Sequence, residues 1–141
     1  MKDINYYNTF IQVAPDSPVE ASVIPTSNRK KTPAHILAYE MLSENPYVMT
    51  QMEVLFAVHA KHKAIPQADL DERHDELWAQ FFGKDMACFR ANALPKKFGW
   101  GVHFDAEGKM KLVAMESAEY AELANSDCKQ LLAMRSSRQK K

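Results

Sequence analysis

The chain has 141 residues with 18 basic and 18 acidic side chains, so its formal net charge is zero. This length corresponds to one domain, large enough to bury about 68–70% of its unfolded surface. The 46% apolar content excludes a disordered chain, and no apolar run approaches the ~18 residues that span a bilayer. The first residues lack the apolar stretch of a secretory signal, and the two cysteines form no CxxC pair. We therefore expect a single cytoplasmic domain over residues 1–141 that has no membrane partner.

The zero net charge combines two unlike parts. Residues 129–141 hold five basic and no acidic side chains, so residues 1–128 carry 13 basic against 18 acidic groups, a balance of −5. Bulk attraction to nucleic acid is therefore not favoured. Residues 136–141 form a basic tail, which either frays into solvent or contacts an acidic partner.

The N-terminal third contains a strand, a long loop and a helix. Residues 4–14 are rich in β-branched and aromatic types, which predicts a strand. Prolines and serines over 15–31 predict an irregular surface loop that ends in Arg29-Lys30-Lys31. Thr32 before Pro33 is typical of a helix start, with Thr32 as the N-cap, and predicts a helix over about 33–44.

Two further helices follow. Thr50 and Glu53 have the spacing of a capping box and predict a helix over about 51–63. Apolar side chains recur at three- and four-residue steps through 67–82, which predicts one continuous helix there.

The C-terminal half predicts a β-hairpin. Residues 98–104 alternate strictly between large apolar side chains and small or polar ones, and 110–115 form the return strand after a turn at 105–108. Residues 116–124 predict a short helix, and 129–135 a final strand or helical turn. We therefore expect an α+β domain in which a small antiparallel sheet, made of the N-terminal strand and the central hairpin, packs with three to four helices on one face.

Several stretches resemble a family of small uncharacterised bacterial proteins, a domain of unknown function. These stretches are NYYNTFI (5–11), NPY (45–47), EVLFAV (53–58), CFRANALPKKFGWGVHFDAEGK (88–109), ESAEY (116–120) and MRSSR (134–138). The resemblance extends over nearly the whole chain and is most specific around FGWGVHFD. It implies a single cytoplasmic domain and transfers no activity, cofactor or site residue.

One candidate chemistry is catalytic. Cys88 lies close in sequence to Arg90 and His103, and a thiol beside cations has a lowered pKa and is nucleophilic. With His103 as base, the pair would form a cysteine-dependent enzyme, although no known nucleophile signature surrounds Cys88. The alternative is a buried structural cysteine.

The second candidate chemistry is anion binding. Arg90, Lys96 and Lys97 precede a strand in which Gly99 and Gly101 flank Trp100. Arginine binds carboxylate and phosphate through two parallel hydrogen bonds. A strand glycine indicates that a ligand, or another part of the chain, approaches the backbone closely. We therefore consider these residues a ligand-binding surface, assisted by 29–31 and the tail.

The remaining candidates concern metals and self-association. His59, His62 and His74 fall on predicted helices, but an ordinary packed histidine accounts for each, and we assign no metal and no cofactor. The preferred hypothesis is a non-enzymatic binding module for an anionic small molecule or acidic partner. The alternatives are an enzyme that uses Cys88 and His103, and a homo-oligomeric interaction protein whose oligomeric state the sequence leaves open.

Overall fold

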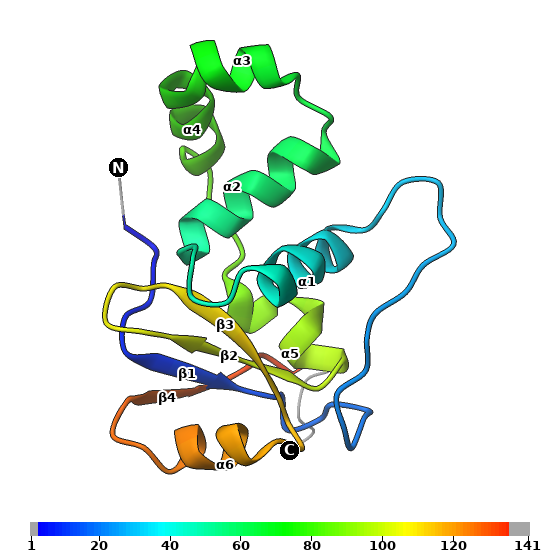
Figure 1. Cartoon of the computed structure of the whole chain (residues 1–141), viewed down its shortest axis with the longest axis vertical. Coiled ribbons are helices and arrows are strands. Elements are labelled where there is room, and N and C mark those ends of the chain that lie inside the picture. The colour runs from blue at the N-terminus through cyan, green and yellow to red at the C-terminus, as the bar shows by residue number, and fades with distance from the viewer. Residues whose placement is uncertain (1–2, 136–141) are drawn as a thin grey trace.

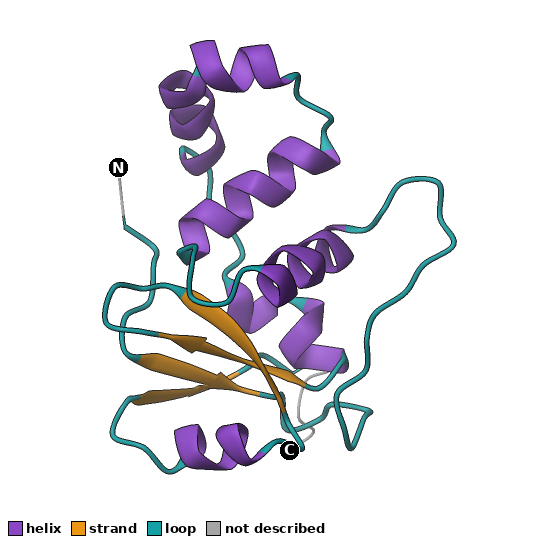
Figure 2. Cartoon of the chain, in the orientation of Figure 1, coloured by secondary structure: helices purple, strands orange, loops and turns teal. Residues whose placement is uncertain are grey.

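The computed structural model describes residues 3–135, so the predicted tail at 136–141 lies outside the described residues. It is a single α+β domain (Figures 1 and 2). In chain order the elements are β1 (Thr9–Gln12), α1 (Ala34–Glu44), α2 (Gln51–His62), α3 (Gln67–Glu72), α4 (His74–Phe82), the 3-10 turn η1 (Phe89–Ala91), α5 (Ala93–Lys97), β2 (Trp100–Phe104), β3 (Met110–Ala114), α6 (Ala118–Ala124) and β4 (Lys129–Leu132). Among the described residues, no helix combines the length and apolarity needed to cross a membrane.

The sheet has the strand order β3-β2-β1-β4. The hairpin pairs β2 with β3, placing His103 opposite Lys111, and β1 pairs antiparallel with β2. Both pairings were expected, and in the turn between β2 and β3 Gly108 has a positive φ of 81°. Residues 129–135, predicted as a strand or a helical turn, contribute β4, which pairs with β1 in parallel. The sheet is therefore mixed at one edge.

The N-terminal strand is shorter than the predicted 4–14. Asn8 adopts a positive φ of 46°, which places it outside the extended conformation just before β1 begins. Beyond Gln12 the chain turns away, and the backbone N–H of Ala14 donates to Pro95 rather than to a strand (2.9 Å). Within the described residues no helix or strand lies between β1 and α1, as the loop prediction for 15–31 required.

Helices cover both faces of the sheet, whereas one face was predicted. The face that carries Ile11, Val102 and Phe104 packs under α1 and α5 and forms the main core. On the opposite face, Tyr120 of α6 packs edge-on against Phe10, with 5.0 Å between the ring centroids. Figure 1 shows α6 alone beneath the sheet. The prediction was wrong for α6 because its few apolar side chains do not reveal which face they contact.

The two long helices begin differently. Thr50 and Glu53 form the predicted capping box at the start of α2, with Thr50 N–H donating to the Glu53 carboxylate at 2.9 Å. The N-cap of α1 is Pro33 instead of the predicted Thr32, and no side chain caps that helix. Its first residues are Ala34 and His35, one position later than expected.

The predicted continuous helix over 67–82 is interrupted at Arg73. This residue has φ −120° and ψ 23°, ending α3 and beginning α4. The chain there contains no glycine or proline. Beyond the break, rings of α4 contact Phe56 of α2. We call the α3–α4 pair the helical arm. It projects from the body of the molecule in Figure 1.

The residues before the hairpin fold into two short helical segments. They form η1 and then α5, whose start is capped by the Asn92 side chain accepting from Leu94 N–H at 2.9 Å. Pro95 lies in the first turn of α5, where its missing N–H has no intrahelical partner to lose. Leu94 and Pro95 are buried in the core, which explains why this short segment is helical.

Candidate functional site

Cys88 lies at the N-cap of η1 and is partly buried. The hydroxyl of Tyr6 donates a hydrogen bond to its sulfur (3.3 Å). Burial and this bond raise the pKa of Tyr6 to about 12. The Tyr6 ring packs against Phe104, with 5.2 Å between centroids, so the Cys88–Tyr6 pair lies on the core face of the sheet.

His103 lies on the opposite face of the sheet from Phe104, because successive side chains in a strand point to opposite faces. Its Nδ1 is 2.8 Å from the hydroxyl of Tyr47 and shares a hydrogen bond with it. Burial lowers the pKa of His103, although nearby Asp105 and Glu119 oppose that shift. Cys88 and His103 therefore have different partners on different faces. Among the described residues, no contact joins Cys88 to His103. Their assignment as a catalytic pair stays a prediction.

Sequence reasoning missed the neighbours of His103. Lys111, directly opposite it in the hairpin, pairs with Glu119 of α6 at 2.9 Å, and its Nζ lies 5.8 Å from the centroid of the Tyr47 ring. The register of the predicted hairpin could have identified Lys111 as a neighbour of His103. Tyr47 and Glu119 come from other elements, so no local pattern identifies them. These four side chains join the 45–49 loop and α6 to the sheet.

Arg90 forms hydrogen bonds with the backbone of β4 and of the residues that follow it. Its Nε donates to the carbonyl of Leu132 (2.8 Å), and its own carbonyl accepts from Met134 N–H (2.7 Å). Leu132 and Met134 direct these groups away from β1, because alternate residues of a strand bond to opposite sides. Arg90 therefore covers part of the outer edge of β4 and limits further strand pairing there.

The glycines at 99 and 101 lie under other parts of the chain. A Cβ on Gly101 would come within 2.8 Å of the Tyr120 ring and 2.9 Å of the Phe10 ring. A Cβ on Gly99 would come within 2.9 Å of the carbonyl oxygen of Ala21. The Trp100 indole N–H donates to Val23 O at 2.9 Å. At these glycines it is therefore another part of the chain, α6 or the long loop, that approaches the backbone closely.

Lys96 and Lys97 occupy the last turn of α5, where cations complement the helix dipole. Lys97 is exposed and Lys96 partly buried. The assignment of these residues to a ligand-binding surface stays a prediction.

A larger basic site lies where the long loop meets the end of α2. It is a hollow of about 520 Å³ lined by Lys30, Lys31, Thr32, Leu37, Lys61, His62, Lys63 and Ala64. We call it the basic hollow. No aspartate or glutamate lines it, and no ion pair within residues 3–135 involves its lysines. Basic residues at 29–31 were expected from the sequence, whereas Lys61 and Lys63 were missed although they lie together at the end of a predicted helix.

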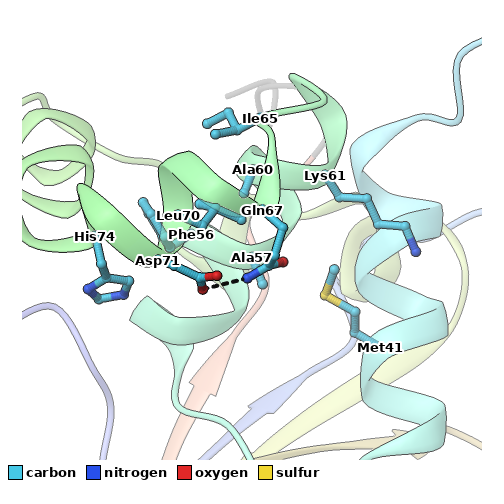
Figure 3. Close-up of a pocket in the computed structure, with 10 residues that line it drawn as sticks. All are labelled: Met41, Phe56, Ala57, Ala60, Lys61, Ile65, Gln67, Leu70, Asp71 and His74. Atoms are coloured by element: carbon cyan, nitrogen blue, oxygen red, sulfur yellow. Dashed lines mark hydrogen bonds between the residues drawn. The ribbon is translucent and has the colours of Figure 1, made fainter.

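An adjoining hollow of about 510 Å³ is mainly apolar (Figure 3). We call it the apolar hollow. It lies between α1, α2 and α3 and is lined by Met41, Phe56, Ala57, Ala60, Lys61, Ile65, Gln67, Leu70, Asp71 and His74. Lys61 lines both hollows. The side-chain amide of Gln67 donates to Asp71 at 2.9 Å, so these two polar groups satisfy each other.

Two of the three histidines considered for metal binding, His59 and His74, contact aromatic rings. His59 stacks on Phe81, with 4.3 Å between centroids, and His74 stacks on Trp78 at 5.6 Å. Within residues 3–135, no group of three or more His, Cys, Asp or Glu side chains is arranged to hold a metal ion. The two histidines help to attach the helical arm to α2.

The comparisons with known proteins identify a family but assign no activity to it. The model of a family of unknown function, DUF6157, matches residues 1–139, and the chain therefore belongs to that family. No curated protein and no solved structure matches the chain. Any function has to be argued from the geometry above.

Proposed function

We propose that this member of DUF6157 is a non-catalytic binding module for a multiply charged anion, and that the anion is held in the basic hollow. The observation that carries the proposal is the convergence of Lys30 and Lys31 from the loop with Lys61 and Lys63 from the end of α2 around one open hollow. Lysine ammonium groups bind phosphate and other anions as point charges. The hollow offers them to one ligand without a competing carboxylate among its lining residues.

The end of α2 accounts for only part of this charge. Carbonyl groups at a helix C-terminus carry partial negative charge, so Lys61 and Lys63 stabilise the helix by their position alone. Lys30 and Lys31 come from a loop and have no such role. Bringing them beside Lys61 and Lys63 sets like charges against one another, and a bound anion relieves that repulsion.

The residues proposed from the sequence give an alternative location for the anion. Arg90 already donates to Leu132, while Lys96 and Lys97 lie on α5, outside the set that lines the basic hollow. The hollow is therefore favoured over α5. The pair Lys96 and Lys97 becomes a matched control, because its removal subtracts the same charge at another place.

The test is calorimetric titration with inorganic tripolyphosphate at low and raised salt. We expect binding that weakens as salt is added, since the contacts are exposed charges. The double variants Lys30→Ala/Lys31→Ala and Lys61→Ala/Lys63→Ala should each bind roughly tenfold more weakly, at about 0.5–1 kcal/mol for each exposed charge.

The control Lys96→Ala/Lys97→Ala should bind as the parent protein does. Loss of binding in this control alone would move the anion to α5. Absence of tripolyphosphate binding to the parent protein would reject the proposal.

A further inference from the structure

The two hollows lie along α1 and α2 and share Lys61 in their linings; we call the pair the groove. Leu37 lines the basic hollow and Met41 the apolar one, and residues four apart lie on the same face of a helix. On α2, Ala57 lines the apolar hollow and Lys61 lines both, while Lys63, at the C-cap of this helix, lines the basic hollow. The groove thus changes along its length from apolar, beside α3, to cationic, beside the 29–32 loop.

The polar groups of the apolar hollow are spread along it, with Lys61 at the cationic end and Gln67 between Lys61 and Asp71. In Figure 3, Lys61 and Met41 lie on one side of the hollow, while Asp71 and His74 lie on the other. Asp71 accepts a hydrogen bond from Gln67 and would repel an anionic group placed beside it. An anion is therefore directed toward Lys61, and an apolar group toward Phe56, Ala57 and Leu70.

We infer that the ligand is a small amphiphilic anion, with its charged head in the basic hollow and a single apolar chain in the apolar hollow. This inference rests on the proposed function and adds the chemical class of the ligand. The apolar hollow has a volume of about 510 Å³, within the range of sites that enclose small molecules. Its lining is mostly apolar with few polar groups, the usual composition of such sites. The shared Lys61 joins this lining to the cationic end of the groove.

The test is a series of monoalkyl phosphates of increasing chain length, titrated as monomers and compared with inorganic phosphate. The head group is constant, so any gain in affinity reports burial of the chain. We expect affinity to rise about threefold to fourfold for each buried methylene until the hollow is full. A series in which affinity does not change with chain length would overturn the inference.

Two variants locate the chain. Ala57→Leu fills the hollow from a partly exposed helix position, and should flatten the chain-length series while leaving tripolyphosphate binding intact. Leu70→Ala removes part of the wall and should weaken the longest alkyl phosphate severalfold. Leu77→Ala is the matched control, because Leu77 lies on the same arm but lines a different hollow. Equal effects of Leu70→Ala and Leu77→Ala would reject the assignment.

The outcomes separate this inference from the proposed function. If tripolyphosphate binds but chain length has no effect, the ligand is an anion without an apolar part and only the inference fails. If alkyl phosphates bind with the expected length dependence and the lysine variants have no effect, the proposed anion site fails and the apolar hollow stands alone. If neither probe binds, both proposals are rejected.

Discussion

The sheet and the helical arm are held together in different ways. Phe10, Phe104 and Met110 in the sheet are completely inaccessible to solvent, whereas neither α3 nor α4 contains a buried residue. The arm is attached through rings, chiefly Trp78 and Phe81 against Phe56, with centroids 5.2 and 6.0 Å apart. Regions with few buried apolar contacts open most easily. The apolar hollow lies at this boundary, so an occupant would contact both the stable body and the more weakly held arm.

The largest expected effect compares the same substitution in the two regions. Phe104→Ala removes a fully buried ring and should lower the free energy of unfolding by about 3–5 kcal/mol. Phe81→Ala removes a partly exposed ring and should cost about 1–2 kcal/mol. Urea denaturation measures both. Equal losses would show that the arm is as firmly integrated as the sheet.

The next effect concerns a buried amide that joins three segments. Gln51 is completely buried, its Nε2 donates to Ile4 O at 2.6 Å, and its Oε1 accepts from Phe89 N–H at 2.9 Å. Gln51→Leu keeps the approximate size but leaves both backbone groups without partners, which should cost about 2–4 kcal/mol. The exposed Gln67→Leu in the arm is the control and should change stability by less than about 0.5 kcal/mol. A neutral Gln51→Leu would mean that water replaces the amide.

A smaller effect is expected at the start of α2. Thr50→Ala removes the hydroxyl that accepts from Glu53 N–H and should cost about 1 kcal/mol. Neither helix of the arm has a side-chain cap to lose. Ser43→Ala, at an exposed position in α1, serves as the control in the same denaturation experiment. A loss at Ser43 as large as that at Thr50 would argue against a capping contribution.

The smallest effect is a dependence on pH. Burial lowers the pKa of His103, and it also lowers the pKa values of His35 and His59. The unfolded chain therefore binds protons more readily, so stability is complete above the ordinary histidine pKa of about 6.5 and falls as pH drops below it. Melting temperatures measured between about pH 7.5 and 5 should decline for the parent protein and less steeply for His103→Gln. His74→Gln is the exposed control, and a slope unchanged by His103→Gln would contradict the assignment.

Helices and strands that depend on neighbours within a few residues were predicted correctly, and those that depend on tertiary contacts were missed. The hairpin follows from strict alternation between Phe98 and Phe104, and the start of α2 from the Thr50–Glu53 spacing, because both depend on neighbours within a few residues. The break at Arg73 was missed because no glycine, proline or capping side chain marks it. The helix at Ala93–Lys97 was missed because burial of Leu94 and Pro95, a tertiary effect, stabilises so short a helix.

For the candidate site too, the sequence showed the local basic groups, but tertiary packing decided which of them lie together. The sequence indicated basic groups at 29–31 and around Arg90, and the structure assigns them different environments. Arg90 bonds to Leu132 across 42 positions of the chain, and Lys30 shares a hollow with Lys61 across a long loop and two helices. Such distant pairings are set by how the helices pack on the sheet, which no local spacing encodes.

The sequence by itself determined the α+β class, the hairpin and most helix positions, because hydrophobic periodicity and capping act over a few residues. It also separated an acidic body from a basic end, which composition alone is sufficient to define. Only the tertiary structure decided that α6 lies across the sheet from α1, that Cys88 and His103 occupy opposite faces, and that four lysines surround one hollow beside an apolar one. The physical reason is that burial of apolar surface selects which distant segments meet, and the charges they carry are brought together as a consequence.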